Sequence, residues 1–182
     1  MSNVTLTIAT TWDGVGLEAA DKAVVTMLAG DELVIEVDAP FAGDRPPHDP
    51  ATGDVAAPGR TDRLWEHEVV EVFIAEAASR DARYLELELG PHGHWLALAF
   101  AGYRQRWVDN IVLSYEARIE ADRWRGRARL SWLELSRAVT GIEALNAYAI
   151  RGAGAARRYM AAWPAPAGVY AGPDFHRIEH FK

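Results

Sequence analysis

The chain has 182 residues, 49% of them hydrophobic and none of them cysteine. This length suffices for one sizeable core, and the lack of cysteine excludes disulfides, thiolate nucleophiles and cysteine-ligated metals. The net charge of -7 is uneven, because residues 1–91 carry 6 basic and 18 acidic side chains whereas residues 92–182 carry 13 and 8. Since the basic side chains are dispersed along strand-like runs, we expect ion pairs within the protein and no nucleic-acid partner.

No apolar run approaches the roughly 18 residues that cross a bilayer, and residues 1–10 lack the pattern of a signal peptide. We therefore expect a cytoplasmic protein with no membrane partner. The oligomeric state is not indicated by the sequence.

Short apolar and alternating runs separated by turn residues favour an all-β fold, an antiparallel two-sheet β-sandwich of the jelly-roll or immunoglobulin type. We expect one domain over residues 1–182, with at most one short helix near 131–139. The turns at 29–31 and 90–93 each join two strand-like runs and predict two hairpins. The expected strands are, in chain order, 3–9, 22–28, 32–38, 67–75, 83–89, 94–101, 112–120, 124–132, 145–151 and 157–162.

Two segments are rich in proline and glycine. Residues 39–62 contain five Pro and three Gly with little apolar content, which predicts a mobile loop or a lid. Residues 163–173 also carry Trp163 and Tyr170, so this second segment has aromatic rings with which to pack or stack.

Carboxylates recur on the expected strands. Side chains alternate between the two faces of a strand, so Tyr84, Glu86 and Glu88 share one face while the intervening leucines share the other. Glu71 stands alone within an apolar run, which predicts a partly buried carboxylate beside a partner. We expect an Arg/Glu layer on one face of one sheet, either a structural ion-pair network or a ligand-binding face, with its arginines at Arg118, Arg127, Arg129 and Arg151.

Two histidine patterns resemble metal sites. His92 and His94 straddle a turn and are the metal-ligand candidates, but no glutamate follows them to complete a site, so we expect no metal. Residues 176–180 match the His-x-x-Glu-His pattern of inverted zinc peptidases, yet no downstream glutamate follows as a third ligand. We expect this segment to be a tail that closes the edge of the sandwich.

The chain contains seven tryptophans. Aromatic rings beside polar groups suit sugars, whose C–H faces stack while their hydroxyls form hydrogen bonds. Several of the rings fill the core in any sandwich of this size. The tryptophans next to expected loops are Trp12, Trp65, Trp107 and Trp163.

Residues 64–74, 84–98 and 124–135 together, followed by 145–163, resemble the DOMON-like relatives of family 9 carbohydrate-binding modules, in particular a cytoplasmic, uncharacterised branch. The resemblance implies a sugar site made by loops and one sheet face. It makes Trp65 and Trp163 the stacking residues. It also implies calcium, but the chain has no Asp-rich calcium loop, so we expect no cofactor. The polar partners implied are Glu68, Glu71, Arg104 and Arg151.

We therefore expect a non-catalytic domain that binds a mono- or oligosaccharide or another small ligand, with no catalytic residues. One alternative is a structural or protein-interaction sandwich. The second is a metal- or carboxylate-dependent enzyme acting on sugars, since Glu86 and Glu88 lie about 6 to 7 Å apart by strand rise, within the range of inverting glycosidases.

Overall fold

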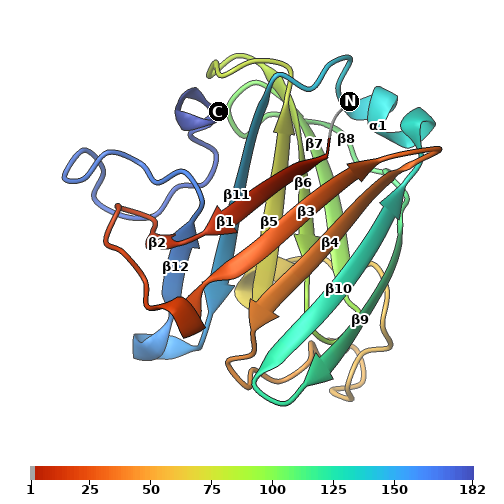
Figure 1. The fold of residues 1–182 in the computed structure, drawn as a ribbon. Coiled ribbons are helices and arrows are strands. Elements are labelled where there is room, and N and C mark those ends of the chain that lie inside the picture. Colours follow the sequence, from red (N-terminus) through yellow and green to blue (C-terminus); the bar gives the residue numbers. More distant parts are fainter. Residues whose placement is uncertain (1–2) are drawn as a thin grey trace.

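The computed structural model describes residues 3–182, which form two antiparallel sheets packed face to face (Figure 1). The first sheet has five strands, and every neighbouring pair in it is antiparallel. In order across the sheet these are β1 (Val4–Ile8), β3 (Ala23–Ala29), β4 (Leu33–Pro40), β10 (Arg123–Leu130) and β9 (Ser114–Glu120).

The second sheet has seven strands. In order across the sheet these are β2 (Thr10–Thr11), β12 (Arg158–Ala161), β11 (Ala144–Arg151), β5 (Val69–Ala75), β6 (Arg83–Leu89), β7 (Trp95–Ala101) and β8 (Arg106–Val108). The fold class predicted from the sequence, an antiparallel two-sheet β-sandwich, is confirmed.

One α-helix, α1 (Trp132–Ala138), follows β10, as predicted. The Ser131 side chain caps it by accepting a hydrogen bond from the Glu134 backbone N–H at 3.2 Å. In the residues described, no helix is long and apolar enough to cross a membrane. Four 3-10 turns complete the secondary structure, namely η1 (Ala19–Asp21), η2 (Leu64–Glu66), η3 (Gly154–Ala156) and η4 (Ile178–His180).

Each predicted strand overlaps an observed one, and both predicted hairpins are confirmed by the pairing of β3 with β4 and of β6 with β7. Strands β2 and β8 were not predicted, because strands of two and three residues are too short to show an alternating pattern. Residues 41–63, most of the predicted loop, contain no strand or helix.

The main core lies between the two sheets. Alternate residues of each strand point into it, and their burial contributes about 1.5–3 kcal/mol for each large apolar side chain. Gly126 on β10 is required by this packing, because a Cβ there would lie 2.5 Å from the Tyr115 hydroxyl. Core residues of β5 and β6 are Val70, Val72, Ile74, Leu85, Leu87 and Leu89.

A second apolar cluster covers the outer face of the seven-stranded sheet, where the C-terminal segment 173–182 packs against it. Phe175 stacks on Tyr148 of β11 with ring centroids 4.0 Å apart, and Phe181 meets Phe73 of β5 edge-on at 5.6 Å. The segment therefore covers a face of the sandwich, and the prediction that it closes an edge is wrong.

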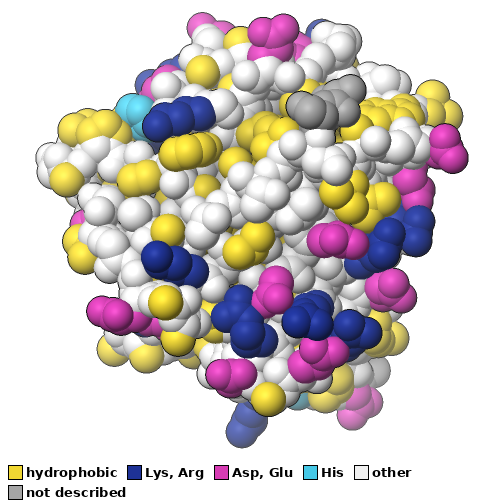
Figure 2. Space-filling view, viewed as in Figure 1, with side chains coloured by type: hydrophobic (Ala, Val, Ile, Leu, Met, Phe, Trp, Pro, Cys, Tyr) yellow, Lys and Arg dark blue, Asp and Glu magenta, His cyan; other side chains and the backbone are white. Residues whose placement is uncertain are grey.

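The predicted Arg/Glu layer is divided between the two sheets. Arg127 and Arg129 lie on the five-stranded sheet and pair with Glu36 at 3.4 Å and Glu32 at 2.7 Å, whereas Glu71 lies on the seven-stranded sheet. Figure 2 shows basic and acidic side chains alternating over the five-stranded sheet, at the lower right. Exposed pairs of this kind contribute about 0–1 kcal/mol each. The prediction of a single layer is wrong, because sequence does not say which strands share a sheet.

Candidate functional site

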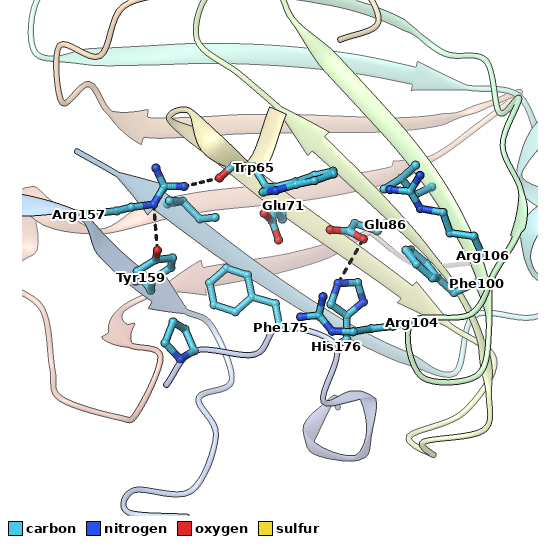
Figure 3. A pocket seen from close by; sticks show the side chains of 13 residues that line it. Trp65, Glu71, Glu86, Phe100, Arg104, Arg106, Arg157, Tyr159, Phe175 and His176 are labelled. Carbon is cyan, nitrogen blue, oxygen red and sulfur yellow. Dashed lines mark hydrogen bonds and ion pairs between the residues drawn. The ribbon is translucent and has the colours of Figure 1, made fainter. Parts of the chain in front are cut away.

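A pocket of about 370 Å³ opens on the outer face of the seven-stranded sheet, beside the C-terminal segment (Figure 3). Strands β5, β6, β7, β11 and β12 supply its floor, while η2, the turn between β7 and β8, and the C-terminal segment supply its walls. Its volume is typical of small-molecule sites. Its lining residues are Trp65, Glu71, Glu86, Leu98, Phe100, Arg104, Arg106, Ile150, Arg157, Tyr159, Pro173, Phe175 and His176.

Buried carboxyl groups lie at the floor of the pocket. Glu71 on β5 and Glu86 on β6 are only 2% and 4% exposed, and the fully buried Glu88 is the register partner of Glu71. Glu86 Oε2 and both carboxylate oxygens of Glu88 have no hydrogen-bond partner among residues 3–182. Burial raises the pKa of Glu86 to about 8. Burial, together with repulsion between the carboxylates, raises the pKa values of Glu71 and Glu88 well above their usual range.

Trp65 forms an aromatic wall, and Arg157 holds it in place. The Arg157 guanidinium donates hydrogen bonds to the backbone carbonyl groups of Trp65 and, at 2.8 Å, of Glu66, both within η2. Its Nε donates to the Tyr159 hydroxyl at 3.0 Å. The η2 turn therefore holds the Trp65 ring at the pocket with support from Arg157, the residue before β12, which is far away in the sequence.

Two further arginines line the other end of the pocket. Arg104, in the left-handed region with φ of 55°, pairs with Asp174 of the C-terminal segment at 3.0 Å. Arg106 forms no ion pair with any residue in 3–182, and none of the pocket arginines lies within 4.0 Å of a Glu71 or Glu86 oxygen. The carboxyl groups and the guanidinium groups therefore line the same pocket but form no ion pairs with one another.

His176 links the pocket to Tyr84. Its Nδ1 shares a hydrogen bond with the Tyr84 hydroxyl at 2.7 Å, and its Nε2 lies 3.8 Å from Glu86 Oε2. The Arg104 backbone N–H donates to the Tyr84 oxygen at 3.1 Å. Burial, with added repulsion from Arg104, lowers the His176 pKa to about 3. The imidazole is therefore neutral at pH 7.

Of the sequence-predicted site residues, the structure brings Trp65, Glu71 and Arg104 together in the pocket. The other three lie elsewhere. Arg151 shares the core-facing side of β11 with Ala147 and Ala149, and its Nη2 donates to the Asp21 carbonyl at 2.7 Å. The ligand-binding roles of all six residues stay predictions, but in this arrangement one ligand cannot contact both the pocket residues and the other three.

Glu68 and Trp163 have structural contacts of their own. Glu68 accepts hydrogen bonds from the Ala42 N–H at 3.0 and 3.1 Å, which fastens the start of the loop to β5. Burial raises the Glu68 pKa to about 7. Trp163 packs against the main core, with the Lys182 ammonium 4.2 Å from its ring centroid. Its backbone N–H and carbonyl are both bound by the Asn146 side chain.

The two metal-ligand candidates have other partners. His92 Nε2 lies 2.8 Å from the Asp44 carbonyl oxygen, and His94 Nδ1 lies 2.9 Å from Thr61 Oγ1. Both contacts tether the loop of residues 41–63. Across residues 3–182, no group of three or more His, Asp or Glu side chains is arranged to hold a metal ion.

Three residues that line the pocket, Arg106, Arg157 and His176, are not among the site residues predicted from the sequence. Arg157 follows a glycine-rich turn, which does not indicate what its side chain contacts, and the only pattern that contains His176 is the one that resembles a zinc motif. Alternation did place Glu86 on the same face as Tyr84, and this was the available signal for a pocket floor.

A second hollow, of about 460 Å³, lies on the outer face of the five-stranded sheet. It is larger, but no aromatic ring lines it. Its charged side chains are at least partly exposed, and most of them form ion pairs, as Arg125 does with Asp38 at 3.3 Å. The smaller pocket, with buried and unpaired carboxyl groups, is the better candidate for a ligand site.

Comparison with solved structures shows the sandwich in other proteins. A candidate carbohydrate-binding protein from Bacteroides uniformis matches 99% of this chain and 84% of its own, with a TM-score of 0.68 and 14% identity. A family 9 carbohydrate-binding module from Caldicellulosiruptor kristjanssonii, in complex with glucose, matches 87% of this chain and 71% of its own, with a TM-score of 0.49 and 12% identity. At these identities, the first likeness concerns the fold alone.

Comparison of sequences gives a closer relationship, although no family model matches the chain. The UPF0462 protein C4orf33 homolog of Danio rerio is 35% identical over 175 residues, which cover 94% of this chain and 84% of the relative. The human UPF0462 protein C4orf33 is 33% identical over 177 residues, with 94% and 83% covered. With this identity over most of both sequences, the chain belongs to the UPF0462 family.

Proposed function

We propose that the pocket on the outer face of the seven-stranded sheet binds a mono- or small oligosaccharide. The observation that carries the proposal is that one pocket is lined by an aromatic ring, buried carboxyl groups and arginines, with no ion pair between these carboxyl groups and these arginines among residues 3–182. A sugar hydroxyl both donates and accepts hydrogen bonds, so it can bridge a carboxyl group and a guanidinium group that do not reach each other.

Trp65 is the stacking residue in this proposal, because its ring is partly exposed inside the pocket and supported by Arg157. Glu71 accepts or, when protonated, donates hydrogen bonds at the floor. Arg104 donates from the opposite side, with its orientation set by Asp174.

The comparison with the Bacteroides uniformis protein supports a carbohydrate as the ligand class, since that protein shares the sandwich over nearly the whole chain and is itself a candidate carbohydrate-binding protein. The kinship with DOMON-like domains stays a prediction. The pocket, and not the likeness of fold, is what selects the site.

The test is a titration of Trp fluorescence and melting temperature with glucose, galactose, xylose, mannose and their disaccharides. A sugar at 100 times its Kd should stabilise the fold by about 2.7 kcal/mol. We expect a saturable response that Trp65→Ala removes, because the variant loses the stacking surface.

Trp107→Ala is the matched control. Trp107 on β8 is 44% exposed and stacks on Arg83, outside the pocket, so its loss should leave the sugar response intact. If no sugar on the panel stabilises the wild-type protein, or if Trp65→Ala responds like the wild type, the proposal is wrong.

A further inference from the structure

Glu86 on the floor of the pocket and His176 on its wall form an acid–base pair. Glu86 Oε2 and His176 Nε2 are 3.8 Å apart, and this oxygen has no hydrogen-bond partner among residues 3–182. The rings of Tyr84, Phe73 and Phe100 enclose the imidazole, with centroids 5.1 to 5.8 Å away. The hydrogen bond between Nδ1 and the Tyr84 hydroxyl holds the ring with Nε2 toward the carboxyl group (Figure 3).

We propose that this pair interconverts the α and β anomers of a reducing sugar bound in the pocket, by moving protons between the anomeric hydroxyl and the ring oxygen. The proposal rests on the proposed sugar site and adds an activity to it. It requires no metal, redox partner or covalent intermediate.

The reaction balances within the pair. The Glu86 carboxyl proton passes to the ring oxygen while the C1–O bond to that oxygen breaks, and the proton of the anomeric hydroxyl passes to His176 Nε2. The electron pair of the broken C1–O bond remains on the ring oxygen, and C1 and its hydroxyl oxygen form the carbonyl of the open-chain aldehyde. Rotation about the C1–C2 bond and the reverse proton transfers then close the ring as the other anomer. General acid–base catalysis of this type contributes about 10²–10⁴-fold in rate.

The spacing of the pair fits this reaction better than glycoside hydrolysis. The ring oxygen and the anomeric oxygen are bonded to the same carbon, so an acid and a base that serve both must lie side by side. The carboxyl groups of glycosidases instead flank the sugar, about 5–5.5 or 6.5–9.5 Å apart. At 3.8 Å the Glu86 and His176 atoms lie side by side, as an acid and a base that act on one carbon must.

The protonation states agree with the assigned roles. With its pKa at about 8, Glu86 holds a proton at pH 7, and His176, with its pKa at about 3, is neutral. The assigned roles use the tautomer in which Nδ1 carries the imidazole proton, so that Nε2 has the free lone pair. Desolvation is the main cause for both groups, and Arg104 and Arg106 oppose the rise at Glu86 while they deepen the fall at His176. The other charged groups that face the pair are Glu71, Glu88 and Asp174.

The experiment follows the optical rotation of freshly dissolved α-D-glucose, α-D-galactose and α-D-xylose with the full chain, while Trp fluorescence reports binding in the same samples. We expect the wild-type protein to accelerate equilibration of at least one sugar that it binds. Glu86→Gln and His176→Asn should each lower that rate by about 100-fold or more. Each should lose less than about tenfold in affinity, the size of one hydrogen bond.

The rate should also fall as pH rises above about 8, because the pair then loses the proton that it must donate. Glu116→Gln, an exposed position on the other sheet, is the control that should keep the wild-type rate. Binding without acceleration in the wild-type protein, or full activity in both folded variants, would overturn this inference and leave the sugar site in place. If the Trp fluorescence shows that the wild-type protein binds no sugar, that result overturns the proposed function as well.

Discussion

Glu71, Glu86 and Glu88 place three carboxyl groups side by side on one face of a sheet, and each of these residues is less than 5% exposed. Nothing in the sandwich itself requires them, because an apolar residue at these positions would pack without the penalty of desolvation. Buried polar groups without partners, clustered at a pocket, are typical of functional sites. This is the residue-level reason for assigning function to this face.

The same burial makes the stability of the fold depend on pH. Glu68 and Glu86 have pKa values of about 7 and about 8 in the folded protein, above the usual 4.5, so these two carboxyl groups bind more protons in the folded than in the unfolded state between pH 4.5 and 8. His176, with its pKa lowered from 6.5 to about 3, has the opposite effect below pH 6.5. We therefore expect the free energy of unfolding to fall most clearly as pH rises from about 6.5 to 8. Chemical denaturation at intervals from pH 5 to pH 9 measures this slope.

Glu86→Gln should flatten part of that slope, since a neutral amide loses no proton, and at pH 9 it should exceed the wild-type stability by about 1–3 kcal/mol. Glu116→Gln should keep the wild-type profile, because that carboxylate is exposed. A wild-type protein equally stable at pH 5 and pH 9 would show that these carboxyl groups are not desolvated.

At the scale of elements, the pocket depends on segments that are not strands. The η2 turn carries Trp65, the C-terminal segment carries His176, and Arg157, the residue before β12, joins the turn to the sheet. Sites on irregular segments are precise only where such side chains fix them.

Arg157→Met should therefore weaken sugar binding although the residue is not the stacking surface. The substitution keeps an unbranched apolar side chain and removes the hydrogen bonds to the Trp65 and Glu66 carbonyl groups and to the Tyr159 hydroxyl. We expect a loss of about 1–3 kcal/mol of stability and a higher Kd, measured by thermal denaturation and fluorescence titration.

Arg158→Met is the matched control, one residue away. Arg158 is half-exposed and its only ion pair in the part of the chain that the structure describes is with Asp21 at 3.5 Å, which contributes about 0–1 kcal/mol. If Arg158→Met and Arg157→Met have equal effects on sugar affinity, the proposed support of Trp65 by Arg157 is wrong.

At the scale of the whole molecule, alternation in the sequence was sufficient to predict the strands and both hairpins, since period-two patterns report which face of a strand is buried. It also placed Glu86 and Glu88 with Tyr84 on one face. Alternation does not assign strands to sheets. The prediction therefore places Arg127 and Glu71 in one layer, whereas in the structure they lie on different sheets. Sheet membership depends on long-range pairing that no local pattern records.

The residues of the candidate site were only partly predictable from the sequence. Trp65, Glu71 and Arg104 line one pocket, whereas Trp163 is hydrogen-bonded to Asn146 and Arg151 to Asp21, away from that pocket. Tertiary packing alone brings Arg157 and His176 to the pocket, from segments about 90 residues away from Trp65 and Glu86.

The most direct test of the central claim is a ¹⁵N and side-chain NMR titration of the full chain with the tightest-binding sugar of the panel. The account predicts saturable shifts concentrated at Trp65 Nε1, Glu71, Arg104, Arg157 and His176, with the five-stranded sheet unchanged. Shifts that instead gather around Arg125 and Glu36, or around Trp163, would place the ligand on another surface and contradict the account.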